Sequence, residues 1–320
     1  YGDTWPTFNG AIGMTYEQAG HSFAGLGVLT EEGDTLTLYD RMIHHATSGL
    51  STVETIVNEK ERVLEEFQKY FDTTRNNGSG SYKTFVVKRN SNPDNASRLL
   101  RYLIAQKIEV HEAVNEVRAS GFDYQSGQVG RVTIEKGDYV VSTYQPQGTL
   151  VRVLFEPKPE LADSLTYDIT AWEAHYSFGV EGFAIQGQVE VQPISFDTES
   201  ELTPVVSDPY AYLVEWKSFD DAQFLAHLFK QGIRARYAEE SFSIQGKNYD
   251  AGTLIITRKG NEKLSNRFDA ILKDAALVFN RILVPVTSGL VTQGKDFGSS
   301  SVQFIEAPRV GVLAGEGTSS

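Results

Sequence analysis

Two stretches of similar pattern decide the fold: Thr84-Phe-Val-Val-Lys-Arg89 and Tyr210-Ala-Tyr-Leu-Val-Glu-Trp216. Each contains a short apolar run of the kind that forms a buried strand. Each is followed by a helix-start signal, which is Asn92 before Pro93 in the first case and Ser218 in the second. The sequence therefore predicts two similar α/β units.

The correspondence continues beyond these strands. Apolar residues at helical spacing line both predicted helices: Leu99, Leu100, Leu103 and Ile104 in the first, and Leu225, Leu228 and Phe229 in the second. Residues 106–110 and 231–235 are predicted as the next strands, and Gly137 and Gly252 then mark matching strand pairs. Two copies of one arrangement are too few for a solenoid.

The first part of the chain has a different pattern. Gly10-Ala-Ile-Gly-Met-Thr-Tyr16 is predicted as a short, buried strand. Ser51-Thr-Val-Glu54 has the spacing of a capping box, in which the hydroxyl and the carboxylate satisfy each other's backbone N–H groups. An apolar stripe then predicts a helix to about residue 71.

Composition shifts suggest the following boundaries. Residues 1–72 form one unit, 73–81 a polar, glycine-rich linker, 82–147 the first α/β unit, 148–205 a β-rich connection, 206–305 the second α/β unit, and 306–320 the start of a further domain. Strands are expected at 151–155, 183–189 and 309–313, and a helix at 262–283. We expect the chain to be a segment of a longer polypeptide.

Composition also excludes several classes of function. The chain has 320 residues, 29 basic and 42 acidic, and a net charge of −13, which disfavours nucleic acid as a partner. It has no cysteine, which excludes disulfides, thiolate catalysis and cysteine-bound zinc. No apolar run approaches the ~20 residues of a membrane-spanning helix.

Most catalytic motifs are missing. The six histidines show neither a His-x-x-Glu pair nor the i, i+4 spacing of a helical metal site. Gly20-His-Ser-Phe-Ala24 nearly matches a nucleophile elbow, but Ala24 replaces the final glycine and a poor helix start follows. The glycine pairs at 78–80 and 315–317 lack the lysine of a phosphate-binding loop.

Glu17 is the one distinctive carboxylate, because it directly follows the predicted strand. An acid at the end of a buried strand is costly unless it is paired or functional. Loops diverge at the carboxyl ends of strands, where catalytic groups gather. From the residues alone, a structural ion pair and a catalytic role both remain open.

The run from Tyr1 to Gly20, with its Gly-Met-Thr-Tyr-Glu-Gln core, resembles the end of the catalytic domain of large bacterial zinc carboxypeptidases. Leu50-Ser-Thr-Val-Glu54 and the run at 163–172 are also similar to that family. The resemblance implies the end of a carboxypeptidase-like α/β domain, closed by a helix at 51–71 and followed by accessory modules. A further amidotransferase-like domain would begin near residue 309.

The resemblance also implies site residues. Glu17 stands where the family's glutamate acts as general base on zinc-bound water, and Tyr1 is a candidate for the tyrosine that closes over the substrate. Arg41 and His45 are candidates for lining the cleft, although a surface salt bridge is the alternative for Arg41. The zinc ligands would lie outside this chain, so the segment alone would be inactive.

The expected partners are a peptide or protein substrate and the rest of the parent polypeptide. The resemblance implies a secreted, periplasmic or cell-surface location. The alternative is a non-catalytic binding or assembly module of a degenerate peptidase, since most of the chain lies beyond residue 72.

Overall fold

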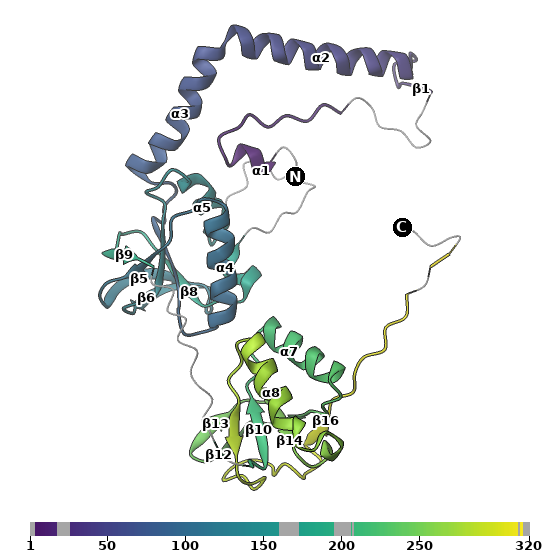
Figure 1. Cartoon of the computed structure of the whole chain (residues 1–320). Helices are drawn as coiled ribbons and strands as arrows, with labels where there is room; N and C mark the ends of the chain where they lie inside the picture. Colours follow the sequence, from purple (N-terminus) through teal and green to yellow (C-terminus); the bar gives the residue numbers. More distant parts are fainter. Residues whose placement is uncertain are drawn as a thin grey trace. The chain divides into compact units, whose positions relative to one another are not determined.

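The computed structural model describes residues 4–17, 26–159, 173–194, 206, 208–312 and 314–315 (Figure 1). The chain divides into an N-terminal unit, residues 1–195, and a C-terminal unit, residues 196–320. Both contain helices and antiparallel sheets, which confirms the predicted mixed α/β class.

The described part of the N-terminal unit begins with a short helix, a two-stranded hairpin and two long helices. In order, the elements are α1 (Thr4–Thr7), β1 (Gly27–Leu29), β2 (Thr35–Thr37), α2 (Leu38–Asn58) and α3 (Lys60–Asn77). The hydroxyl of Thr37 accepts a hydrogen bond from the N–H of Asp40, whose carboxylate accepts one in return from the Thr37 N–H at 3.0 Å. This capping box fixes the start of α2.

Three local predictions in this region are wrong. The predicted capping box at 51–54 lies inside α2, where the backbone of residues 38–50 already supplies helical partners. Residues 73–77 of the predicted linker form the last turn of α3. Residues 11–17 form neither helix nor strand and are exposed, because no described strand lies alongside to pair with them.

A seven-stranded sheet forms the centre of the N-terminal unit. Its elements are β3 (Thr84–Val87), α4 (Pro93–Ala105), β4 (His111–Ala113), β5 (Val117–Asp123), β6 (Gln128–Ile134), β7 (Tyr139–Ser142), α5 (Gly148–Phe155), α6 (Ala174–Phe178), β8 (Gly182–Ile185) and β9 (Val191–Pro193). The strand order is β6-β5-β8-β3-β7-β4-β9, and all neighbours are antiparallel.

The C-terminal unit repeats this plan. Its elements are β10 (Ala211–Val214), α7 (Phe219–Lys230), β11 (Arg236–Ala238), β12 (Phe242–Ile244), β13 (Lys247–Tyr249), β14 (Leu254–Thr257), the 3₁₀ turn η2 (Glu262–Leu264), α8 (Arg267–Val278), β15 (Val284–Val286) and β16 (Val302–Phe304). The main sheet has the order β15-β10-β14-β11-β16, and β12 and β13 form a separate hairpin.

The five-stranded sheet matches five consecutive strands of the seven-stranded sheet. The order β8-β3-β7-β4-β9 corresponds to β15-β10-β14-β11-β16, and the pairing registers also correspond. When the elements before β3, together with β5, β6, β9 and the short helix α6, are left out of the N-terminal unit, and β12, β13, β16 and the turn η2 out of the C-terminal unit, each unit has the β-α-β-β-α-β connectivity of the ferredoxin-like arrangement. The predicted similarity of two α/β units is therefore confirmed.

A matching glycine turn precedes the third of these common strands in each unit. Gly137 has φ +87° and donates its N–H to the carbonyl of Ala113, while Gly252 has φ +90° and donates to Ala238. Positive φ is a backbone conformation that glycine adopts without steric cost. The glycines that the sequence matched therefore occupy equivalent turns.

Each sheet is covered on both faces. In the N-terminal unit, Phe85 and Val87 pack in one cluster with α4 and α5, whereas Val86 packs with the β5–β6 hairpin on the other face. In the C-terminal unit, α7 and α8 lie side by side over one face, and the β12–β13 hairpin covers the other (Figure 1). Successive side chains of a strand point to opposite faces of the sheet, so each strand contributes residues to two cores.

The segment 148–205 is not a β-rich connection in its described part. Residues 151–155 belong to helix α5, where Val151, Leu154 and Phe155 are buried in the core of the N-terminal unit. Residues 182–185 form β8, which joins that unit's sheet between β3 and β5. β-Branched composition favoured a strand at 151–155, but burial against the sheet favours a helix.

Further predictions differ from the structure. The prediction of strands at 106–110 and 231–235 is wrong, because these residues form a turn and a non-strand segment in each unit and the strands β4 and β11 begin only after them, at His111 and Arg236. The predicted helix 262–283 is the turn η2 followed by α8, which ends at Val278. Residues 309–312 form no strand and are exposed, so the strand predicted at 309–313 is wrong in its described part.

No helix in the described part of the chain has the length and apolar character to cross a bilayer.

Candidate functional site

Helix α2 carries two of the residues that the sequence singled out. Its first turn is ordered by the Thr37–Asp40 box, and the hydrogen bonds from Thr37 hold the pKa of Asp40 below its usual value. Arg41, one residue later, is only 8% exposed. Arg41 is therefore buried, and both its role in lining the cleft and a salt bridge stay predictions. His45, one turn further along, is exposed.

The chain before Glu17 lies against the same helix. The hydroxyl of Tyr16 is hydrogen-bonded to the hydroxyl of Thr52, which in turn donates to the carbonyl of Ser48 at 2.8 Å. Residues 41, 45, 48 and 52 follow the spacing of three to four that places side chains on one helix face. The structure thus puts the residue next to Glu17 on the helix face that bears Arg41 and His45.

Along that face, the contact between Tyr16 and Thr52 lies well away from Arg41 and His45. His45 and Thr52 are seven residues apart, which is about 10 Å along a helix axis. Glu17 itself is exposed, so it is not the buried end of a strand. Glu17 is therefore not an acid at the end of a buried strand, and its expected role depends on the resemblance alone. Tyr1 and Gly20-His-Ser-Phe-Ala24 lie outside the described residues.

The described residues do not fit a zinc ion by themselves. Nowhere among them do three or more His, Asp or Glu side chains gather in a group that could hold a metal. His44 and His45 are adjacent on α2 and are therefore displaced around the helix from one another.

One histidine is built into the interior of the N-terminal unit. His175 is 1% exposed and stacks on the ring of Tyr124, with 3.9 Å between centroids. Its Nε2 lies 2.9 Å from the carbonyl oxygen of Val86, and its Nδ1 lies 3.3 Å from the carboxylate of Glu173. Burial raises the pKa of Tyr124, whose hydroxyl donates to Phe155. This cluster joins α6 to the sheet and is closed to substrates.

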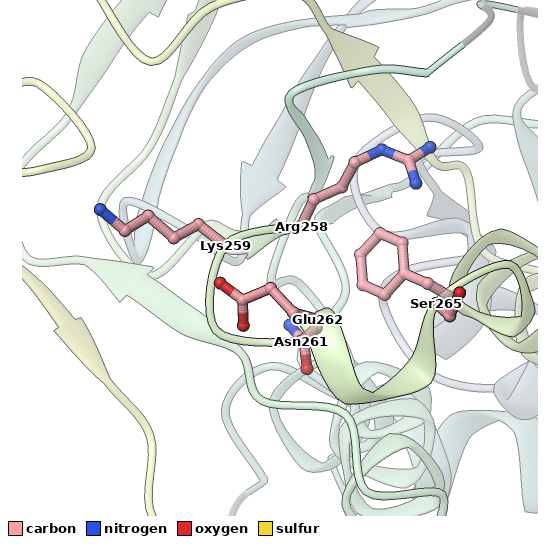
Figure 2. Close-up of a pocket in the computed structure, with 6 residues that line it drawn as sticks. Arg258, Lys259, Asn261, Glu262 and Ser265 are labelled. Atoms are coloured by element: carbon pink, nitrogen blue, oxygen red, sulfur yellow. The ribbon is translucent and has the colours of Figure 1, made fainter.

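The C-terminal unit contains a pocket that the sequence did not indicate (Figure 2). It has a volume of about 400 Å³ and is lined by Arg258, Lys259, Asn261, Glu262, Ser265 and Phe268. This volume falls within the range of small-molecule sites. Figure 2 shows Arg258 and Lys259 extending in different directions, with Glu262 on the side of Lys259.

The charges of this pocket are largely engaged within the unit. Arg258 donates two hydrogen bonds to the carboxylate of Asp269, at 2.8 and 2.7 Å, and a third to the carbonyl of Pro209. Tyr212 also donates to Asp269, and its pKa is raised by burial and by this hydrogen bond. Backbone N–H groups of Gly260 and Glu262 lower the pKa of the Glu262 carboxyl.

The equivalent corner of the N-terminal unit is covered by α3. There, the hydroxyl of Thr74 donates to the carbonyl of Pro146 at 3.0 Å, and Gly78 approaches Thr143 and Tyr144. The difference follows from the connection after the third common strand, which spans residues 143–147 in one unit and 258–266 in the other. This longer connection was the one sequence signal that could have drawn attention to the pocket.

The lining residues offer hydrogen-bond donors and one carboxylate, but no nucleophile with an adjacent base. Comparison with known proteins adds no assignment, because the chain matches no family model, no curated protein and no solved structure. The α2 region and the fold itself therefore carry the functional argument.

Proposed function

We propose that this chain is a segment of a zinc carboxypeptidase that includes the C-terminal part of its catalytic domain, in which Glu17 is the general base and residues 82–305 form accessory modules. The substrate would be a peptide or protein, and the intact protein would be exported. The resemblance of the first 20 residues supports the assignment of Glu17. The observation that carries the proposal is the exposed apolar surface of α2 and α3.

These helices present many large apolar side chains to solvent. They follow one another at spacings of three, four or seven residues: Tyr39, Ile43, Leu50, Val53, Val57, Leu64 and Phe67. Leu50 is 72% exposed and Val57 is 63% exposed. Met42 and Ile56 widen the stripe beyond the narrow seam of a coiled coil.

A stripe of this width is typical of a helix packed on a globular core. None of these side chains belongs to the four core clusters of the described residues. Contiguous exposed apolar surface of this extent marks an interaction site. It supports a fold in which α2 packs against further elements of a peptidase domain that this chain does not supply.

Glu17 is accessible, as a group that must meet substrate and water has to be. In the proposed enzyme, zinc held by residues outside this chain would activate a water molecule. The carboxylate of Glu17 would accept a proton from that water and pass it to the leaving amine. The Tyr16–Thr52 hydrogen bond would hold the adjoining backbone against α2.

The test uses the intact protein that contains this chain. The Glu17→Gln variant should lose about 10²-fold or more in the rate of release of C-terminal residues from peptides, because the amide cannot accept the proton. Its zinc content, measured by atomic emission, should equal that of the unsubstituted protein. Glu54→Gln, an exposed change on α2, is the matched control and should leave the rate unchanged.

Full activity of the Glu17→Gln variant would contradict the proposed role of Glu17. An intact protein that binds no zinc and releases no residues would favour the alternative of a binding or assembly module. The tandem ferredoxin-like units favour that alternative specifically, because they account for most of the described residues. A pull-down with the full chain as bait would then identify its partners.

A further inference from the structure

Strand β6 is an unusual sheet edge in this protein. It lies at one end of the seven-stranded sheet and has seven residues. The other described strands that end a sheet order have three residues each, and two of them contain proline: Pro193 in β9 and Pro285 in β15. Short edges and edge prolines are the usual protection against pairing with another chain. The long edge of β6 has neither.

The hydrogen-bond pattern shows which backbone groups of β6 point outward. Tyr124 donates its N–H to Gly182 of β8, so even-numbered residues of β5 face β8 and odd-numbered residues face β6. In the β5–β6 register, Gly121 pairs with Gly130 and Ala119 with Val132. Even-numbered residues of β6 therefore bond to β5. The N–H and C=O groups of residues 129, 131 and 133 point away from the sheet.

The side chains of the same three residues share one face. The register places Arg131 opposite Ser120 and Val129 opposite Phe122, and Arg118 lies opposite Thr133 on that face. Arg118 and Arg131 are exposed. Lys158 lies over the Phe122 ring, 5.7 Å from its centroid. At the end of the hairpin where Val117 pairs with Ile134, Glu116 pairs with Arg118 at 3.1 Å and Glu135 directly follows β6.

The opposite face holds the strand in place. Val132 and Ile134 are buried in the cluster that includes Val86 and Ile185, so β6 cannot turn to hide its edge without losing this burial. A rigid, extended edge that carries Arg131 is therefore preorganised. In a chain with a net charge of −13, this local basic face stands out.

We propose that β6 binds an extended, acidic polypeptide segment as an additional antiparallel or parallel strand. Backbone pairing would supply affinity, and carboxylates at alternate positions of the segment would lie beside Arg131 of β6, with Arg118 of β5 one strand further on the same face. The proposal is independent of the proposed peptidase activity, because the surface lies entirely in the accessory sheet.

The test measures binding of the full chain to a fluorescent octapeptide, acetyl-(Val-Glu)₄-amide, by anisotropy. Arg131→Pro removes one outward N–H without breaking a bond to β5, since proline is tolerated at such edge positions. We expect the dissociation constant to rise by about tenfold. The corresponding (Val-Lys)₄ peptide should bind more weakly than the acidic one.

Arg131→Glu keeps the N–H and reverses the charge, so it should weaken the acidic peptide and strengthen the (Val-Lys)₄ peptide. If the Arg131→Pro variant fails to fold, the Arg131→Glu variant still tests the proposal. No binding of the acidic peptide to the unsubstituted chain, or equal binding by all three proteins, would overturn the proposal. Self-association of the chain that Arg131→Pro abolishes would identify a second copy as the occupant and equally overturn it.

Discussion

At the scale of single residues, one buried amide repeats in both units. Gln145 accepts a hydrogen bond from the N–H of Glu109 at 2.7 Å and donates to the Glu109 carbonyl at 3.1 Å. Asn261 makes the same pair of bonds to the N–H and carbonyl of Arg234, at 2.7 and 2.9 Å. Each amide thereby joins the segment that follows the third common strand to the backbone two residues before the second common strand.

Replacing Gln145 by leucine should destabilise the N-terminal unit by about 2–3 kcal/mol, because two backbone groups of Glu109 lose their partner. Chemical denaturation, followed by hydrogen exchange of peptides from each unit, measures the loss. Asn261→Leu should act on the C-terminal unit in the same way. Gln125→Leu, at an exposed turn, is the control. A loss equal to that of the control would contradict the proposed role of the amide.

The sequence predicted well those features that depend on only a few neighbouring residues. Asn92 caps α4 and Ser218 caps α7, as expected, because a cap is made within one turn of its own helix. The partner of Gln145 lies 36 residues away in sequence, and no local pattern identifies it. The long-range contact therefore became visible only in the folded chain.

At the scale of secondary-structure elements, the docking of α3 on α5 depends on one glycine. A Cβ atom at Gly148 would lie 2.1 Å from the carbonyl oxygen of Thr143 and 2.9 Å from the Cβ of Thr74. The Thr143 oxygen is a backbone atom, and the Thr74 Cβ is bonded directly to the backbone of α3, so neither can move by a side-chain rotation. Gly148 thus permits the close approach of the two helices.

We expect Gly148→Ala to destabilise the N-terminal unit by about 1–3 kcal/mol through overpacking. Gly130→Ala is the matched control, because a Cβ there would meet nothing within 4 Å. Urea denaturation of both variants provides the comparison. Equal stability of the two variants would show that α3 shifts to accommodate the methyl group at no cost.

Element type was harder to predict than element existence. The apolar stripe correctly indicated a long helical region before residue 72, since periodicity reports burial on one face. It could not place the break at Glu59, where α2 ends and α3 begins. The strand predicted at 10–16 lacks a partner strand among the described residues, and an apolar run forms a sheet only when one is present.

At the scale of the whole molecule, α2 provides the test of whether the chain is part of a larger fold. Leu50→Lys with Val57→Lys should change the stability of this chain by less than about 0.5 kcal/mol, because both side chains are exposed. In the intact protein the same pair should cost about 2–5 kcal/mol if the stripe is buried there. Thermal unfolding of the two proteins compares these values.

Glu54→Lys, an exposed change on the same helix, is the control and should have little effect in either protein. Equal stability of the intact protein with and without the double substitution would leave the apolar stripe without a partner domain. That result would remove the main structural support for the peptidase proposal, whereas the Glu17→Gln experiment tests its chemistry separately.

By itself, the sequence determined the α/β class, the duplication of an α/β unit and the caps of its helices, because these follow from composition, periodicity and neighbouring residues. Only the tertiary structure decided the strand order, the helical state of residues 151–155, the burial of Arg41 and the exposure of Glu17. These properties depend on which distant surfaces meet, since burial and backbone pairing are satisfied by the whole fold rather than by the local chain.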